Sequence, residues 1–383
     1  MSKRYLISTA GLPNFGDEQI VRTWLKFYQD ECPNDQIILD VPFPARASFL
    51  FQGEFENIQF VDTIWNLVYL ANAKGLTLKN EPEVSAILHG GDPRNNVPIR
   101  EMFESDKIHI LGGGYFSTEH DEFSYTYLFF MMLALIKQDK PEIELLATGV
   151  GLTPINDEIV KAIGQYTAAL SYLGVRDQPS LIVPNTTFEP DDVVMSLHLS
   201  AIKLHENSDN PDILLSIQPF KTSALSHEFL RLLIEYLRQP RNRTKKIGIL
   251  EAMVPEDNWL FFSDALQAYP DIQSRVVFFD FWTIWQQGMP VKPGQEWIST
   301  RFHYHLIGAL LGYKGTAIGS GSPYYAVKHT SLIDLGTSWQ YILLEEGNTP
   351  SIQPKFHQLS KIKLGRTAKK KFQNMRQLLI KQQ

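Results

Sequence analysis

The feature that most constrains this fold is an alternation of short apolar segments with longer helical patterns along the whole chain. In the first half, the apolar segments predict strands at residues 4–8, 36–40, 58–61, 84–88, 107–111, 144–148 and 170–175. Between several of them, apolar residues recur with helical spacing at residues 17–28, 125–137 and 157–166. This alternation is typical of βαβ units, whose parallel strands form one sheet covered by helices.

A polar segment at residues 201–211 interrupts the alternation and is predicted to be a linker, since it ends in Asn210-Pro211. Beyond it, strands are predicted at residues 213–217, 246–250, 276–279, 297–300 and 316–319, and helices at 227–238, 257–268 and 302–311. A chain of 383 residues is too long for one hydrophobic core. We therefore predict an α/β protein with two Rossmann-like doubly wound domains, at residues 1–200 and 201–350, and a site in the cleft between them.

Residues 351–383 are predicted to form a basic C-terminal helix. Apolar residues recur there every three or four positions, at Leu364, Ala368, Phe372, Met375 and Leu379. The segment 347–383 carries nine Lys or Arg and no Asp or Glu. The net charge of the whole chain is −6, so the rest of the chain has a net charge of −15. Such an acidic body argues against nucleic-acid binding. The helix, expected over 361–381, either lies on an anionic surface or packs on the first domain.

Other features of the sequence point to the cytoplasm. The longest apolar run, at 123–136, is shorter than the roughly 20 residues needed to cross a bilayer. Lys3 and Arg4 precede only a short apolar segment, so no signal peptide is predicted. With one cysteine, Cys32, the chain forms no internal disulfide. We expect a cytoplasmic protein that can reach the inner face of the membrane through its basic helix.

Ligands of open α/β sheets bind beyond the carboxyl ends of the strands, so a site is expected at the turns that follow the predicted strands. The first turn holds Asn14, Gly16 and Asp17, and Asp17 is predicted to cap the following helix. A later turn is a triple glycine that includes Gly113 and Gly114 and leaves backbone amides for an anion. Either turn can equally be explained by helix capping or close packing.

Cationic residues follow three other predicted strands. Arg176 stands at a strand end, where its guanidinium suits a carboxylate or phosphate, although a salt bridge to Asp177 or another local acid is an alternative. Arg301 and His303 open a helix whose N-terminus favours an anion. A buried structural histidine is the alternative for His303, and a surface lysine is the alternative for Lys328.

No metal site is predicted. No zinc-ligand spacing is present, and the adjacent Asp191 and Asp192 should point apart on a strand. Neither a P-loop nor a nucleophile elbow follows any predicted strand.

Taken in order, the turns resemble the motifs of the polysaccharide pyruvyl transferase family. The matching segments are 14–17, 112–114, 149–151, Arg176-Asp177 with Ser180, 299–303, and 325–328. The chain departs from the family pattern where Leu152 and Thr153 precede Pro154, where Gln295-Glu296 precedes the Ser-x-Arg-x-His element, and where the segment 189–192 replaces a simple Asp-Pro.

The resemblance implies a glycosyltransferase-B-like architecture and a role in cell-surface or exopolysaccharide biosynthesis. It implies phosphoenolpyruvate as the donor co-substrate, with no other cofactor, and a saccharide acceptor that can be lipid-linked. Two acceptor hydroxyls would become a pyruvate ketal. The catalytic residues implied are His303, Arg301 and Arg176, and the substrate-binding residues are Lys328, Asn14, Gly16, Asp17, Gly113, Gly114 and Tyr325.

Two other functions remain open at the level of sequence. A nucleotide-sugar glycosyltransferase on the same fold would need a ribose-binding carboxylate, which Glu251 could supply after the strand 246–250. A non-catalytic homologue would bind glycans without transferring a group.

Overall fold

The computed structural model describes residues 2–91, 96–118, 125–218, 223–320, 323–345 and 350–380. Tertiary contacts divide the chain into two units. Unit 1 comprises Met1–Leu12, Ile20–Asp192 and the end of the chain from Met375, and unit 2 comprises Pro13–Gln19 and Val193–Asn374. The short segment Pro13–Gln19 therefore belongs to unit 2, although both of its flanking segments belong to unit 1.

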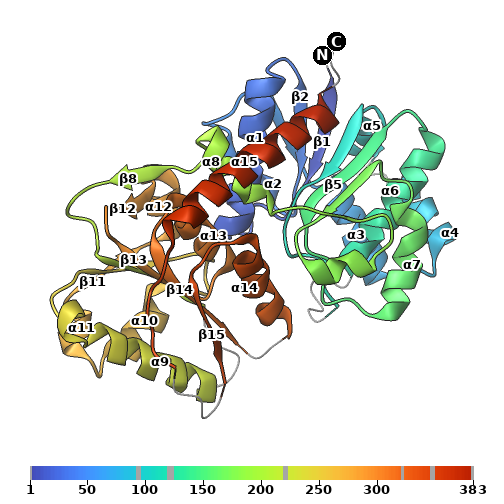
Figure 1. Ribbon diagram of the computed structural model, residues 1–383. Helices are drawn as coiled ribbons and strands as arrows, with labels where there is room; N and C mark the ends of the chain where they lie inside the picture. The colour runs from blue at the N-terminus through green and yellow to red at the C-terminus, as the bar shows by residue number, and fades with distance from the viewer. Residues whose placement is uncertain are drawn as a thin grey trace. The chain divides into compact units, whose positions relative to one another are not determined.

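Unit 1 is built on a seven-stranded sheet in the order β3-β2-β1-β4-β5-β6-β7, with every pairing parallel (Figure 1). The strands are β1 (Lys3–Ile7), β2 (Gln36–Asp40), β3 (Ile58–Val61), β4 (Lys107–Ile110), β5 (Glu144–Val150), β6 (Tyr172–Val175) and β7 (Thr187–Phe188). Strand order reverses between β1 and β4, which makes the carboxyl ends of these two strands the switch point of the sheet.

The helices of unit 1 bury their apolar faces in one large core. They are α1 (Phe15–Glu31), which begins in the unit 2 segment, α2 (Pro44–Phe51), α3 (Thr63–Ala73), α4 (Glu81–Ala86), α5 (Asn96–Phe103), α6 (Leu128–Asp139) and α7 (Asp157–Thr167). In α6 every residue from Leu128 to Ile136 is buried, which explains the longest apolar run in the sequence. No helix in the described part of the chain is long and apolar enough to cross a membrane.

The strand predicted at residues 84–88 is wrong. These residues lie in α4 and in the irregular turn Ile87–Gly91 that continues it. Val84, Ile87 and Leu88 are buried, and their spacing of three and four fits one face of a helix better than a strand. A run of five apolar-rich residues is too short to distinguish a helix from a strand.

Unit 2 repeats the topology of unit 1. Its parallel sheet has the order β11-β10-β9-β13-β14-β15, so the switch point lies between β9 and β13. Its strands are β9 (Ile213–Ser216), β10 (Ile247–Leu250), β11 (Val276–Phe279), β13 (Glu296–Ser299), β14 (Lys314–Ser320) and β15 (Gln340–Leu344). The prediction of two Rossmann-like doubly wound domains is confirmed.

The segment predicted as a plain linker contains a strand. Within residues 201–211, β8 (Leu204–Glu206) pairs in parallel with β12 (Met289–Val291), and Asn210 donates to the carbonyl of Val291 at 3.1 Å. The strand pairing and the bond from the Asn210 side-chain amide hold a segment whose polar side chains predicted a loop.

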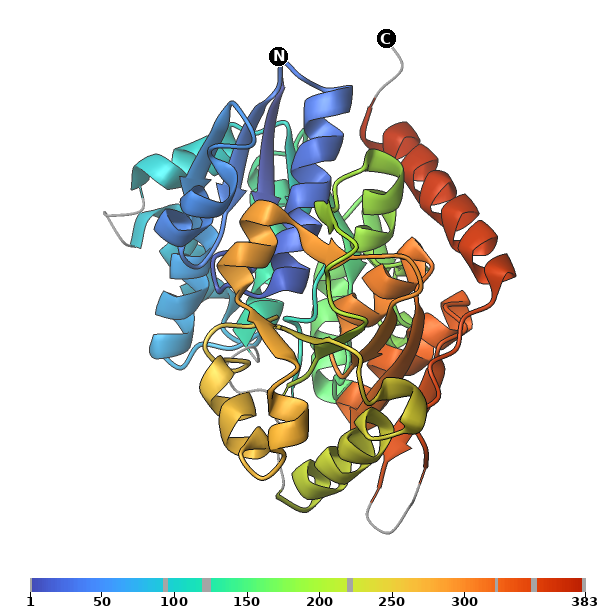
Figure 2. The same ribbon diagram turned by 90° about the vertical axis from the view of Figure 1, so that its left-hand side faces the viewer.

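The helices of unit 2 described by the structure include four that the sequence did not predict, α8, α11, α12 and α14. The full set is α8 (Met195–Leu199), α9 (Ser223–Leu237), α10 (Trp259–Leu266), α11 (Pro270–Gln273), α12 (Phe281–Gln287), α13 (Phe302–Leu311), α14 (Pro323–Leu335) and α15 (Gln358–Leu379). In both views of the molecule α9, α10 and α11 lie beside one another (Figures 1 and 2).

The C-terminal helix α15 packs through the predicted stripe. Leu364, Ala368, Met375 and Leu379 are at most 1% exposed. The end of the helix belongs to unit 1, where Arg376 pairs with Glu31 at 2.6 Å. The prediction that this helix packs on the first domain is confirmed for its end only, because the helix up to Asn374 belongs to unit 2.

Candidate functional site

The turn that follows β13 lies at the switch point of unit 2. The N–H of Thr300 donates to the carbonyl of Ser216 in β9 at 3.0 Å. Ser299 closes the turn, because its hydroxyl accepts from the N–H of Arg301 at 3.0 Å and donates to the carbonyl of Arg301 at 2.9 Å. The turn is thus held on both sides before α13 begins.

Arg301 occupies the position that precedes α13 and pairs with a buried acid. Its Nε and Nη2 donate to the two carboxylate oxygens of Asp257 at 3.0 and 2.5 Å. The Asp257 side chain is fully buried, whereas that of Arg301 is 17% exposed. A partly accessible guanidinium at the N-terminus of a ten-residue helix is suited to an anionic ligand.

His303 lies directly against the turn that opens α1. Within unit 2, Asn14 bridges to Met253 and the N–H of Phe15 donates to the carbonyl of Ala252 at 2.7 Å. A Cβ atom on Gly16 would lie only 1.7 Å from Nδ1 of His303. The first turn and the Ser-x-Arg-x-His element, far apart in sequence, therefore meet in one unit.

The prediction that Asp17 caps this helix is wrong. Helix α1 begins at Phe15, so Asp17 stands in its first turn and Asn14 precedes it. Asn14 accepts from the N–H of Gly16 at 3.3 Å and donates through Nδ2 to Asp17 at 2.9 Å. Asn is as good a helix-capping residue as Asp, so residue type alone did not identify the start.

Tyr304 is a polar residue of this site that the sequence did not predict, because it lies in an apolar helix. Its ring packs 5.1 Å from that of Phe15. Burial raises the pKa of Tyr304 well above its ordinary value, and the Asp257 carboxylate acts in the same direction. Its hydroxyl makes no hydrogen bond to any described residue, so it stays a protonated donor beside the Arg301 ion pair.

A buried pair of histidines connects this turn to α14. His305 lies on α13 and His329 on α14, with their Nδ1 atoms 3.1 Å apart. Nε2 of His305 lies 2.8 Å from the hydroxyl of Thr337, and Nε2 of His329 lies 3.2 Å from the carbonyl of Thr300. Both nitrogens of His305 therefore have partners within the fold.

The partners of the pair determine where its protons lie. A carbonyl only accepts, so Nε2 of His329 carries the proton and its Nδ1 is an acceptor. Nδ1 of His305 must then donate, and its Nε2 accepts from Thr337. Burial lowers the pKa of His329 to about 4 and that of His305 well below its ordinary value, in agreement with two neutral rings.

Lys328 precedes His329 on α14, and its charge contributes to the lowered pKa of that histidine. Through the bond of His329 to Thr300, the helix that carries Lys328 is held to the Arg301 turn. The predicted contact of Tyr325 lies outside the described residues, since its side chain is not described.

The glycine turns of unit 1 surround acidic side chains of the chain itself. The carboxylate of Asp192 accepts from the N–H of Gly112 at 3.0 Å, from the hydroxyl of Thr148 at 2.9 Å and from the indole of Trp24 at 2.8 Å. A Cβ atom on Gly149 would lie 2.7 Å from Asp192, and the N–H of Gly149 donates to Glu189 at 2.7 Å. These contacts explain Gly112 and Gly149 by packing.

The predicted anion-binding glycines lie at the same edge. Gly113 has a φ of 149° and bridges in parallel to Val150, and its carbonyl accepts from the N–H of Gly151 at 2.9 Å. Gly114 follows it. Their role in substrate binding stays a prediction.

Arg176 follows β6 and pairs with an acid that follows the neighbouring strand β7. Its Nη1 donates to Asp191 at 2.7 Å, and the two side chains are 6% and 1% exposed. Asp191 and Asp192 do bind different partners, as expected, but they follow β7 and do not lie on a strand. Asp177 accepts from the N–H of Ser180 at 3.0 Å and from its hydroxyl at 2.7 Å.

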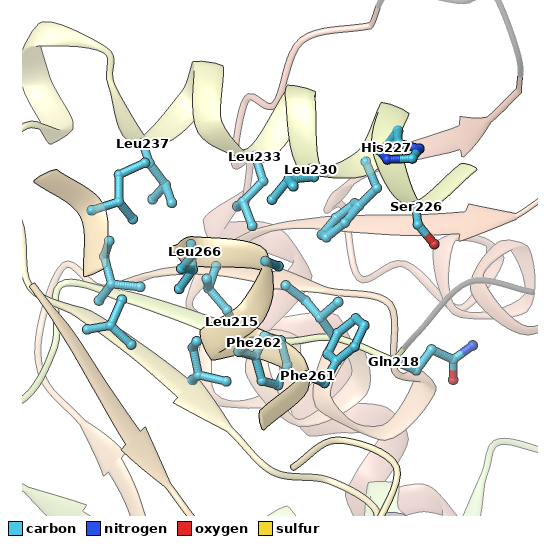
Figure 3. A pocket seen from close by; sticks show the side chains of 17 residues that line it. Leu215, Gln218, Ser226, His227, Leu230, Leu233, Leu237, Phe261, Phe262 and Leu266 are labelled. Carbon is cyan, nitrogen blue, oxygen red and sulfur yellow. The ribbon is translucent and has the colours of Figure 1, made fainter. Parts of the chain in front are cut away.

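Within the described ranges, no group of three or more His, Cys, Asp or Glu is placed to hold a metal ion. A separate cavity of roughly 260 Å³ lies in unit 2 between β9, β10 and the helices α9–α11 (Figure 3). Leu230, Leu233 and Leu237 face Phe262 and Leu266 across it. Its polar lining, Gln218, Ser226 and His227, is confined to one end, so the cavity itself is unsuited to a polyanion.

Solved structures with the same architecture share little sequence with this chain. A glycosyltransferase of Rickettsia africae superimposes with a TM-score of 0.52 at 11% identity, covering 100% of this chain and 99% of its own. HepE of Anabaena, solved with UDP and glucose, has a TM-score of 0.52 at 10% identity, covering 98% and 91%. A UDP-GlcNAc 2-epimerase of Methanocaldococcus jannaschii has a TM-score of 0.50 at 9% identity, covering 98% and 99%. The fold is thus glycosyltransferase-B-like.

The family is defined by sequence. The profile of the family described as polysaccharide pyruvyl transferase matches residues 14–322. The chain therefore belongs to the polysaccharide pyruvyl transferase family, as the order of its motifs predicted. The search of curated proteins returned no match.

Proposed function

We propose that this protein transfers the pyruvyl group of phosphoenolpyruvate to a saccharide and forms a pyruvate ketal. The proposal rests on the turn at Arg301, where the guanidinium, His303 and the buried hydroxyl of Tyr304 lie at the N-terminus of α13. It also rests on the membership of this chain in the family. Phosphoenolpyruvate is a small polyanion with a carboxylate and a phosphate, and such ligands bind where a switch point and a helix N-terminus coincide.

The guanidinium of Arg301 can donate hydrogen bonds to a second anionic group besides Asp257. Nε and Nη2 are committed to Asp257, whereas Nη1 has Met253 Sδ at 3.9 Å, a weak contact. Asp257 thus orients the guanidinium, and Nη1 is the group we assign to the donor's carboxylate or phosphate. Lys328 supplies a second positive charge for the phosphate, and Tyr304 a neutral hydrogen-bond donor.

His303 is the group we assign to proton transfer. It protonates the methylene carbon of phosphoenolpyruvate, which becomes a methyl group and leaves positive character at C2. One sugar hydroxyl adds to C2, the C–O bond to phosphate breaks, and phosphate leaves with the electron pair. A second hydroxyl closes the ketal. Of the two protons released by the hydroxyls, one returns to His303 and the other to phosphate.

The role of Arg176 in the donor site stays a prediction, and its buried partner Asp191 favours a positioning role. We further propose that the acceptor is a saccharide of cell-surface or exopolysaccharide biosynthesis, used in the cytoplasm.

A rival function is transfer from a nucleotide sugar. It draws support from HepE, whose solved structure contains UDP and glucose, but that likeness concerns the fold alone. Glu251, the carboxylate this rival would need, already accepts from the N–H of Phe281 at 2.8 Å at the start of α12. One of its oxygens is therefore committed to the fold.

Phosphate release and thermal shift separate these functions. Phosphoenolpyruvate should raise the melting temperature, and phosphate should appear only when a suitable saccharide is added from a panel of glycans and glycolipids. Stabilisation and activity with nucleotide sugars alone would overturn the proposal in favour of the rival. No response to either donor, together with glycan binding, would indicate a non-catalytic homologue.

A further inference from the structure

Helix α15 has two different faces. One carries the buried apolar stripe, and the other is exposed. Leu359 and Ile362 are large apolar residues near its start, yet they are 79% and 53% exposed. They line a shallow surface depression together with Lys363, Arg366, Thr367 and Lys370. At 100° per residue these positions fall on one side of the helix, opposite the buried Leu364, Ala368, Met375 and Leu379. We call these six residues the outer stripe.

The charge of α15 is uniformly positive. Between Gln358 and Leu379 the helix carries seven Lys or Arg and no Asp or Glu, and it is drawn in red as one uninterrupted helix in Figure 2. Some of these cations have structural partners. Arg376 pairs with Glu31, Lys371 is 2% exposed, and Lys363 lies over Gly336 at the end of α14, where a cation suits the helix dipole.

Arg366 and Lys370 remain as the outward cations of the stripe. Both are exposed, and neither forms an ion pair with a carboxylate in the part of the chain that the structure describes. They stand one turn apart, in line with the exposed Leu359 and Ile362. Exposed aliphatic side chains beside unpaired cations are the pattern of a helix that lies in a membrane interface.

We propose that the outer stripe docks this protein on the anionic surface of a phospholipid bilayer. Leu359 and Ile362 enter the boundary between headgroups and acyl chains, and Arg366 and Lys370 contact lipid phosphates. A nucleic acid would use the cations but gain nothing from two exposed aliphatic residues, whereas a bilayer uses both. The stripe does not depend on the proposed transferase reaction.

The test is co-sedimentation of the full-length protein with vesicles. Vesicles of phosphatidylglycerol mixed with phosphatidylcholine should bind the protein at low salt and release most of it at high salt, whereas phosphatidylcholine alone should not bind it. The double variant Arg366→Gln/Lys370→Gln should lose about tenfold in affinity. Leu359→Ser/Ile362→Ser should lose several-fold while melting at the wild-type temperature, because these side chains are exposed.

Arg376→Gln is the control, since it removes one positive charge of α15 outside the stripe. It should lose less affinity than either single variant, Arg366→Gln or Lys370→Gln. Equal losses for Arg376→Gln and for those variants would show attraction by net charge and overturn the stripe. Absence of binding to anionic vesicles at low salt would overturn the proposal outright, as would binding to RNA or an acidic peptide but not to vesicles.

Discussion

Two arginines, one in each unit, follow the carboxyl end of a parallel strand and pair with a buried aspartate, yet their surroundings differ. Arg176 is 6% exposed, and the glycine turns around it already donate to Asp192 and Glu189. Arg301 is 17% exposed, opens a helix, and lies with His303 and Tyr304. We infer that an arginine at a strand end can take an added anion only where the chain's own carboxylates leave a donor uncommitted, and in unit 2 we assign this role to Nη1 of Arg301.

The largest effect should come from His303 in unit 2, the residue to which we assign proton transfer. His303→Asn should lower turnover by roughly 10²–10⁴-fold, because it removes a general acid, while the melting temperature stays close to that of wild type. Donor affinity should fall less than in Arg301→Ala, since the arginine makes the charge contact. Turnover, donor affinity and melting temperature should be measured on the same preparation, and a pH–rate limb present only in the wild type would support the assignment.

A structural His303 would give the opposite pattern. The melting temperature of His303→Asn would then fall together with its activity. A stable variant with near-normal turnover would end the catalytic assignment.

In unit 1 the same kind of substitution should act on stability. Arg176→Met should lower the free energy of unfolding by about 3–5 kcal/mol, because Asp191 would remain buried without its partner. The double variant Arg176→Met/Asp191→Leu should recover part of this loss. Denaturant unfolding of both variants gives the measurement. If Arg176→Met retained wild-type stability while donor binding disappeared, Arg176 would be a ligand-binding residue like Arg301.

Acid should weaken unit 2 through its histidine pair. The pKa of His329 is lowered to about 4 by burial, so the unfolded state binds the extra proton between roughly pH 6.5 and 4, and stability falls as the pH falls through that window. The loss reaches up to about 3 kcal/mol for His329, at about 1.36 kcal/mol per pKa unit. Unfolding of wild type and His329→Gln should be compared across this range.

The difference between the two proteins is the quantity to measure, because Asp40, whose burial raises its pKa to about 8, changes stability in the opposite direction. The same substitution at the exposed His227 provides the matched control for replacing a histidine with glutamine in this unit. The neutral pair would be refuted if wild type and His329→Gln lost stability in parallel.

The smallest effect concerns close packing at the two glycines Gly16 and Gly365. Gly16→Ala should destabilise by about 1–3 kcal/mol and reduce turnover, because its Cβ atom would lie 1.7 Å from His303. Gly365 in α15 has no atom within 4 Å of such a Cβ, so Gly365→Ala should stabilise by about 0.5–1 kcal/mol. Thermal unfolding of both variants tests this contrast, and a neutral Gly16→Ala would refute the close contact with His303.

The sequence predicted most of the fold because its periodicity is a local property. Helix α13 has the predicted bounds, and the core strands of both sheets lie within a few residues of those expected. The prediction for residues 84–88 was wrong because five apolar-rich residues fit the period of a strand as well as that of a helix. Strand β15 and helix α14 were not predicted, because their patterns are short or polar. Since β15 is an edge strand, its omission leaves the central strands of the unit 2 sheet unchanged.

The candidate site was predicted less completely, because its contacts join distant segments. The motifs identified Arg301 and His303, but no pattern linked them to Asp257, which lies in an ordinary acidic stretch, or to Tyr304 within an apolar helix. The Glu189–Asp192 segment looked like a departure from the family, whereas its acids organise the glycine turns of unit 1. Only the three-dimensional structure shows which carboxylate accepts a hydrogen bond from which donor.

The most direct test of this account is the affinity for phosphoenolpyruvate of wild type, Arg301→Ala and Asp257→Asn, measured by calorimetry in the absence of acceptor. We predict that wild type binds and that Arg301→Ala loses at least about tenfold in affinity, as expected for a charge-assisted contact. Asp257→Asn should lose less affinity, because the guanidinium remains but is no longer oriented. Wild-type affinity in Arg301→Ala would contradict the placement of the donor at the switch point of unit 2.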